Sequence, residues 1–266
     1  MVAAAVQWAE RIMRNCWKTI LMSGKTDILL IVETGLQKIH IPPLTRPPVA
    51  DDNPNEELVL WGIQYYSYSV IAHLRTVLRG LVQLIEAANI PTAFIVSRHI
   101  FEWAAHTCYM SRHLKNYVLR KEWGRAWHLH SLAMEGNRWL KDHGSKYEPT
   151  LVTDEVPDPL GVTNIVASYE EYRRQMHGHA DAKDTYGLLS EHSHPNSACF
   201  LPYYQYIGRE VRFIAPSPDT SLLGEKRCLI DLMMFLNALL KLGQERAVRA
   251  QVVATLKELA GLADTW

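Results

Sequence analysis

Two short stretches of the sequence hold most of the side chains that could do chemistry. In the first, Arg98 and Glu102 are four residues apart, which places them one turn apart on the same side of a helix. Phe94, Phe101 and Ala105 lie on or beside this side, so we expect both charges to point into the protein. A guanidinium could there bind an anionic group next to a carboxylate able to act as a base. The alternative is a structural ion pair in which each charge only satisfies the other.

The second stretch is "TYGLLSEHSHPN", in which Tyr186, Ser190 and His194 follow one another at steps of four. On a helix these three side chains lie one above the other on one face. Because the residue before a proline avoids the helical conformation, His194 should be the last helical or first non-helical residue, and its imidazole could turn back under Tyr186 and Ser190. The alternative is that His194 only caps the helix, where a histidine is favoured by the unpaired carbonyls.

Histidines near these stretches suggest metal binding, but their spacing does not favour it. His99 and His106 lie one turn on either side of Glu102, yet the chain has no second Glu-x-x-His motif to complete a metal site in a bundle. Histidines at 177 and 179, and at 192 and 194, would diverge on a helix and could not share one ion. We therefore expect neither a metal nor another cofactor.

Composition and motifs exclude several other functions. The 28 basic and 28 acidic residues cancel, so no net charge attracts nucleic acid or an anionic membrane. The chain contains neither a Gly-x-Ser-x-Gly motif nor a phosphate-binding glycine loop. Its four cysteines are scattered, which fits reduced thiols, and the apolar run "CLIDLMMFLNALLKL" is too short for a bilayer span of roughly 20 residues. We expect a cytoplasmic protein with no membrane partner.

The elements that must position these residues are predicted to be helices. Apolar residues recur at three- and four-residue steps, which predicts an all-α protein: a single domain over 1–266, a bundle of about eight or nine helices. A long loop is expected at 141–164, and β-type alternation predicts a small hairpin or extended arm near 204–215. Two small helical domains separated near that loop are the alternative. The expected helices cover 3–22, 26–39, 56–88, 91–116, 122–140, 164–178, 182–193, 222–242 and 244–262.

The segment "SRHIFEW", followed by "YGLLSEHSHPN", resembles a group of all-helical bacterial proteins over about residues 60–200. Their pattern is Arg-x-x-x-Glu on one helix and Tyr-x-x-Leu-Ser, then a histidine, on a later one. That group looks related to the HEPN (higher eukaryotes and prokaryotes nucleotide-binding) superfamily, many of whose members are toxins or phage-defence ribonucleases. The resemblance implies an all-helical fold but supplies no known reaction. The pattern falls on Arg98, Glu102, Tyr186, Leu189, Ser190 and His194.

Three hypotheses about function follow from these patterns. The first is a HEPN-like protein from a defence or toxin setting, whose cluster of Arg98, Glu102, Tyr186, Ser190 and His194 binds a small anionic ligand or RNA. The second is a non-enzymatic scaffold in which these residues form a structural polar network. The third is a metal-dependent enzyme that uses Glu102 with a nearby histidine. The arginine-histidine spacing of HEPN ribonucleases occurs here about as often as chance allows, and a homodimer is an expectation without a residue-level basis.

Overall fold

The described residues of this computed structural model cover most of the central part of the chain. They are 27–87, 89–135, 161–177, 181–193, 204–207, 210–213 and 250–255, with the single residues Asp231, Met234, Leu236, Ala238 and Leu242. The helix expected at 3–22 and most of the loop expected at 141–164 lie outside these residues.

The described residues are predominantly helical, which confirms the all-α class. Each helix corresponds to one that the sequence predicts, although α7 begins two residues before the expected start, inside the end of the predicted loop. Residues 231, 234, 236, 238 and 250–255 are also helical and fall within the two expected C-terminal helices. The helices are α2 (Asp27–Lys38), α3 (Glu56–Glu86), α4 (Ile90–Leu119), α5 (Trp123–Glu135), α7 (Val162–His177) and α8 (Ala182–Ser193).

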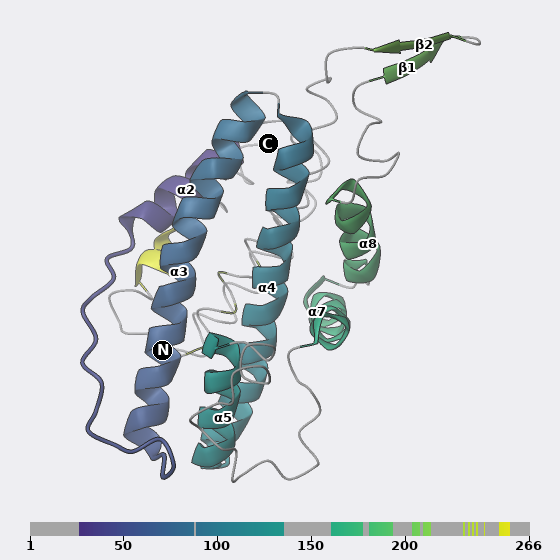
Figure 1. The fold of residues 1–266 in the computed structure, drawn as a ribbon. Helices are drawn as coiled ribbons and strands as arrows, with labels where there is room; N and C mark the ends of the chain where they lie inside the picture. Colours follow the sequence, from purple (N-terminus) through teal and green to yellow (C-terminus); the bar gives the residue numbers. More distant parts are fainter. Residues whose placement is uncertain are drawn as a thin grey trace.

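A small antiparallel hairpin confirms the arm expected near 204–215. Strand β1 (Tyr204–Ile207) pairs with β2 (Glu210–Phe213), with Tyr204 opposite Phe213 and Ile207 opposite Glu210. Figure 1 shows the hairpin lying away from the helices. None of the helices in the described ranges combines the length and apolar character that a bilayer crossing needs.

Helix α4 is the centre of the described helices. It packs against α3, α5, α7 and α8, and Figure 1 shows it beside α3 with α7 and α8 on its other side. Phe101 and Cys108 are buried on one side of α4, and Ile100 and Met110 are buried on the opposite side. A helix that is apolar on two sides belongs between other helices, and the packing of α4 confirms the predicted central position.

Local sequence signals explain where the long helices start. The side chain of Asn55 caps α3, because its Oδ1 accepts a hydrogen bond from the backbone N–H of Leu58 at 3.0 Å. Pro91 lies in the first turn of α4, where its missing N–H leaves no hydrogen bond unmade.

The end of α4 is closed by two backbone hydrogen bonds. The N–H of Lys121 donates to the carbonyl of Val118 at 3.1 Å, and the N–H of Glu122 donates to the carbonyl of Tyr117 at 2.9 Å. This pair of bonds is the Schellman motif, which requires a left-handed residue at its centre. Lys121 takes that conformation with φ of 57° and allows the chain to turn into α5.

The end of α2 is capped by a side chain from α3. Arg75 donates from Nε to the carbonyl of Leu36 at 2.8 Å, and its Nη2 donates to the carbonyl of Ile39. These carbonyls belong to the last turn of α2 and the residue after it, and that of Leu36 also accepts from the backbone N–H of Ile39 at 3.2 Å. The side chain of Arg75 therefore joins the two helices.

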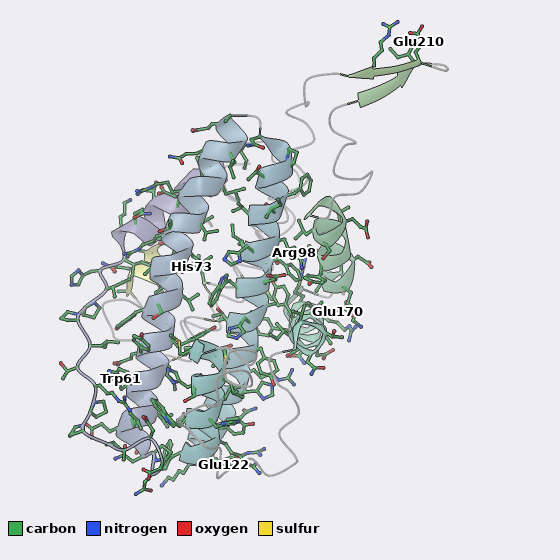
Figure 2. All side chains as sticks on the ribbon, in the orientation of Figure 1. Trp61, His73, Arg98, Glu122, Glu170 and Glu210 are labelled. Carbon is green, nitrogen blue, oxygen red and sulfur yellow. The ribbon has the colours of Figure 1, made fainter. Side chains whose placement is uncertain are left out.

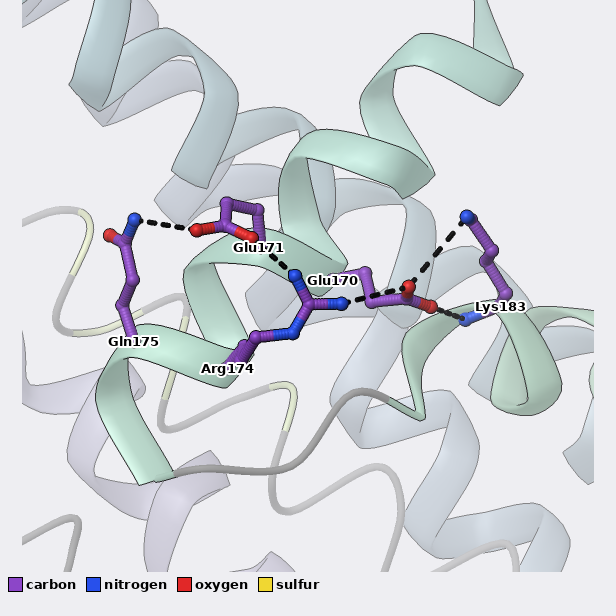
Figure 3. A network of polar contacts seen from close by, with 5 residues as sticks. All are labelled: Glu170, Glu171, Arg174, Gln175 and Lys183. Carbon is purple, nitrogen blue, oxygen red and sulfur yellow. Dashed lines mark hydrogen bonds and ion pairs between the residues drawn. The ribbon is translucent and has the colours of Figure 1, made fainter.

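Charged residues join α7 to α8 at the surface (Figure 3). Glu170 on α7 accepts a hydrogen bond from the backbone N–H of Lys183 at 3.2 Å and pairs with the Lys183 ammonium at 3.6 Å. A carboxylate at this position satisfies one of the free N–H groups at the start of α8. Arg174 pairs with Glu170 and with Glu171, and Gln175 donates to Glu171.

Candidate functional site

Arg98, Glu102 and Tyr186 meet between α4 and α8. The Nε of Arg98 donates to Oε1 of Glu102 at 3.0 Å, and its Nη2 donates to the hydroxyl of Tyr186 at 3.1 Å. The guanidinium carbon lies 5.3 Å from the centre of the Tyr186 ring, within the range of a cation–π contact. Figure 2 shows Arg98 between these two helices. The structure therefore brings together three of the five residues that the sequence selects.

The expected burial of both charges is wrong. The side chain of Arg98 is 26% exposed and that of Glu102 is 36% exposed. At 100° per residue, Arg98 lies about 40° and Glu102 about 80° around the helix from Phe94, so both stand at the rim of the buried side rather than at its centre. Burial acts to lower the pKa of Arg98, but Glu102 and Tyr186 outweigh it and raise that pKa, so the guanidinium stays charged.

Of the two remaining selected residues, the structure describes only Ser190, whose hydroxyl is not hydrogen-bonded to the other three. Ser190 lies on α8 one turn after Tyr186, and its Oγ is buried without a hydrogen-bond partner among the described residues. A buried hydroxyl without a partner is uncommon in folded proteins. His194 lies outside the described residues, so the predicted alignment of Tyr186, Ser190 and His194 stays a prediction.

A cavity of about 320 Å³ adjoins this cluster, between α4, α5 and α7. Glu102 lines the cavity and also pairs with Arg98, so it belongs to both features. The other polar linings are two imidazoles, and most of the remaining surface is aliphatic. The lining residues are His99, Glu102, Trp103, Ala105, His106, Ala133, Val162, Ile165 and Val166.

His106 is held neutral at one wall of this cavity. Burial lowers the pKa of His106 to about 4 and raises the pKa of Tyr66, so both groups are uncharged at neutral pH. The hydroxyl of Tyr66 lies 2.7 Å from Nδ1 of His106. Which of the two atoms donates depends on the tautomer of His106, because a neutral phenol can donate or accept.

His99 is also neutral. Burial lowers its pKa, the neighbouring His73 lowers it further, and Glu102 opposes the shift. The indole N–H of Trp103 donates to Nε2 of His99 at 3.0 Å, which requires a free lone pair on that nitrogen. The cavity therefore offers two uncharged imidazoles and one carboxylate whose charge is balanced by Arg98.

The metal site of the third hypothesis is not formed within the described ranges. There, no group of three or more His, Cys, Asp or Glu side chains is arranged to hold a metal ion. His99 and His106 line the same cavity as Glu102, but each imidazole is held by a different neighbour. His194, the other histidine of that hypothesis, lies outside the described residues.

A second arginine cluster escaped the sequence interpretation. Arg173 on α7 is 1% exposed and pairs with Asp181 at 2.9 Å and with Asp231 at 3.8 Å. The hydroxyl of Tyr169 donates to Asp231 at 2.6 Å, and burial raises the pKa of Tyr169 well above its usual value. Two signals could have revealed this cluster: Arg173 continues the apolar stripe of Ile165 and Tyr169 at steps of four, and Asp231 interrupts the most apolar run of the chain.

Comparison of the chain with protein-family models, with curated proteins and with solved structures finds no match. The resemblance to HEPN proteins therefore stays a prediction that depends on the motif residues alone. Of these, Arg98, Glu102 and Tyr186 contact one another, and Leu189 is buried in the core.

Proposed function

We propose that this chain is a HEPN-like bacterial protein that binds a small anionic ligand or a phosphodiester at Arg98. The observation that carries the proposal is that the Arg98 guanidinium is oriented by Glu102 and Tyr186 and yet its side chain is 26% exposed. Its partner Glu102 lines the cavity. A guanidinium has five N–H groups, and the contacts among the described residues use two of them. The others can donate to phosphate oxygens, which match the planar guanidinium.

A ribonuclease reaction would use the same groups. A neutral imidazole takes the proton of the ribose 2′-hydroxyl, whose oxygen then attacks the phosphorus. The bond from phosphorus to the 5′-oxygen breaks, and the imidazolium returns its proton to that oxygen. Arg98 stabilises the charge that develops on the phosphorus oxygens. Between the two cavity histidines, His99 is the candidate base, because the pKa of His106, about 4, makes it a poor proton acceptor. Nε2 of His99 would take the proton in place of its hydrogen bond from Trp103.

A structural scaffold is the second candidate. It is supported by the position of Arg98, which links α4 to α8 through Tyr186, and by the ring of Phe101, whose centre lies 5.8 Å from that of Tyr186. In that case the cluster would contribute to stability and bind nothing. We retain for both candidates the cytoplasmic location that the sequence predicts, and sedimentation would test the expected homodimer.

The test replaces Arg98 by Gln and, as a control, Arg125 by Gln. Arg125 lies on α5 and pairs with Glu122 at 3.3 Å at an exposed position. Binding of inorganic phosphate and of a single-stranded oligoribonucleotide is measured by calorimetry, cleavage of that RNA by gel, and the free energy of unfolding in urea. We expect Arg98→Gln to weaken binding by about tenfold or more, which corresponds to about 1.4 kcal/mol of binding free energy. The free energy of unfolding of Arg98→Gln should change by less than about 1 kcal/mol, as for an exposed ion pair. Arg125→Gln should bind phosphate and RNA as the unaltered protein does.

The same measurements can contradict the proposal. If the unaltered protein binds neither phosphate nor RNA, or if Arg98→Gln binds them normally, Arg98 is not an anion site. A loss of stability in Arg98→Gln without any ligand binding by the parent protein would support the scaffold instead.

A further inference from the structure

Two histidines from different helices meet at the edge of the cavity. His73 on α3, labelled in Figure 2, and His99 on α4 approach through the same ring atom, with 2.7 Å between the two Nε2 atoms. Their ring centres are 5.0 Å apart and the planes are nearly perpendicular, at 75°. His73 is exposed, whereas His99 lines the cavity, so the pair is reachable from solvent.

The hydrogen bonds around His99 place two donors on one lone pair. The indole of Trp103 can only donate, and it donates to Nε2 of His99 at 3.0 Å. That nitrogen therefore carries no proton, and the contact at 2.7 Å requires His73 to donate from its own Nε2. One imidazole nitrogen has a single lone pair in the ring plane, so the two donors compete for it. The hydrogen bond from His73 to His99 is thus weakened by the competing donor, and a metal ion could replace it.

We propose that His73 and His99 form a two-imidazole binding site for a divalent transition metal ion such as Zn²⁺, Ni²⁺ or Cu²⁺. Imidazole nitrogens are preferred ligands of these ions. Bonds of about 2.0–2.1 Å with an angle near 90–110° at the metal place the two nitrogens about 2.9–3.4 Å apart. The observed 2.7 Å needs to open by only a few tenths of an ångström, which small side-chain rotations provide.

Binding needs no net loss of protons from the two histidines. The Nε2 proton of His73 leaves for solvent, and Nδ1 of the same ring takes one up, so that both Nε2 lone pairs face the metal. Trp103 releases its hydrogen bond to His99. Glu102 lies one turn along α4 from His99, and its negative charge favours a cation nearby.

This site differs from the three-ligand centre discussed above. It takes one ligand from α3 and one from α4, and water completes the coordination. With two protein ligands it should bind more weakly than a structural zinc site, which has four. It does not use Arg98, although it shares His99 with the ribonuclease reaction proposed above.

The test titrates the purified protein with Zn²⁺ by calorimetry and with Ni²⁺ by quenching of tryptophan fluorescence. The ring of Trp103 lies 5.2 Å from that of His73, so an ion bound there should quench its emission. We expect His73→Gln to weaken metal binding by about tenfold or more, because even outer-shell changes cost 10–100-fold. His113→Gln is the control, since His113 is half-buried on α4, the helix of His99, and its ring centre lies 4.1 Å from that of Tyr109.

A further variant separates metal binding from damage to the fold. Trp103→Phe removes the competing donor from His99, so its Zn²⁺ affinity should rise, whereas general damage would lower it. Ions bound by other histidines contribute equally to each protein and cancel in the difference. If His73→Gln binds Zn²⁺ and Ni²⁺ as the parent does, or if Trp103→Phe binds less tightly, the site does not exist. Because no anion is added, that failure would leave the proposal for Arg98 untouched.

Discussion

The chain contains two clusters with the same chemical components and different surroundings. Arg98 pairs with a carboxylate and a tyrosine hydroxyl where α4 meets α8, and its side chain is 26% exposed. Arg173 also has carboxylate partners, close to a tyrosine hydroxyl, but its side chain is 1% exposed. Asp231, which joins Tyr169 to this second cluster, is equally buried.

Burial decides what each arginine can contribute. A buried ion pair loses much of its attraction to the cost of removing both charges from water, yet breaking it leaves an uncompensated charge inside the protein. Arg173 therefore contributes to the stability of the fold. Arg98 remains partly hydrated, so its partners orient it without using all its donors, and it is available to a ligand.

The largest expected difference between the clusters is in stability. Arg173→Met leaves Asp231 buried without its cation, so we expect the free energy of unfolding to fall by about 3–5 kcal/mol. The neighbouring Arg174 pairs with Glu170 and Glu171 at the surface. Arg174→Met should therefore lower the free energy of unfolding by less than about 1 kcal/mol. Urea denaturation measures both. Equal losses at the two positions would show that burial does not distinguish them.

Lowering the pH should reduce stability through the cavity, because His106 lines it. The pKa of His106 is about 4 in the folded protein, against about 6.5 for an unperturbed histidine. The unfolded chain therefore binds a proton first, and stability falls as the pH drops from about 6.5 to about 4, by at most about 3 kcal/mol. Denaturation at a series of pH values should show this slope.

His130 is the necessary control for that pH series, because burial lowers its pKa to about 4 as well. His106→Gln should remove part of the slope and leave the part due to His130. A slope unchanged by His106→Gln would mean that His106 is not the neutral group that its burial indicates.

The smallest expected difference in stability is between changes at Tyr169 and at Tyr186. Tyr169→Phe removes a buried hydrogen bond of 2.6 Å to Asp231 and should cost about 1.5–3 kcal/mol, the range for bonds to charged groups. Tyr186→Phe removes a bond to a partly exposed guanidinium that water can replace, so less than about 1 kcal/mol is expected. Thermal and urea unfolding would compare them. The comparison fails if Tyr186→Phe is the more damaging change.

Periodicity was enough to predict the helices, because each described helix has an apolar side that recurs every three or four residues. The described range of α8 agrees with the predicted helix of about Ala182 to Ser193, whose expected end was based on Pro195. The start of α7 was placed two residues late, although Val162 continues the apolar spacing of Ile165 and Val166 at steps of three and four. Helix ends are the part of a pattern that sequence specifies least.

Three members of the cluster were predictable from the sequence, but their burial was not. Arg98 and Glu102 share a helix side by spacing alone, and Tyr186 was selected on a separate helix without any means of placing the two together. How far α8 covers Arg98 depends on packing between helices, which periodicity does not report. The pairing of Asp231 with Arg173 joins residues 58 positions apart in the chain, and single-sequence patterns contain no such information.

The cap that Arg75 places on α2 has a consequence for the order in which the chain acquires structure. Helix α2 has only 12 residues, a length at which isolated helices are marginal in water. Its final carbonyls are satisfied from α3, and Gly35 lies against the side chain of Thr255 near the far end of the chain. A peptide of residues 27–38 should therefore be mostly unstructured alone, and α2 should become protected from hydrogen exchange only after α3 has formed.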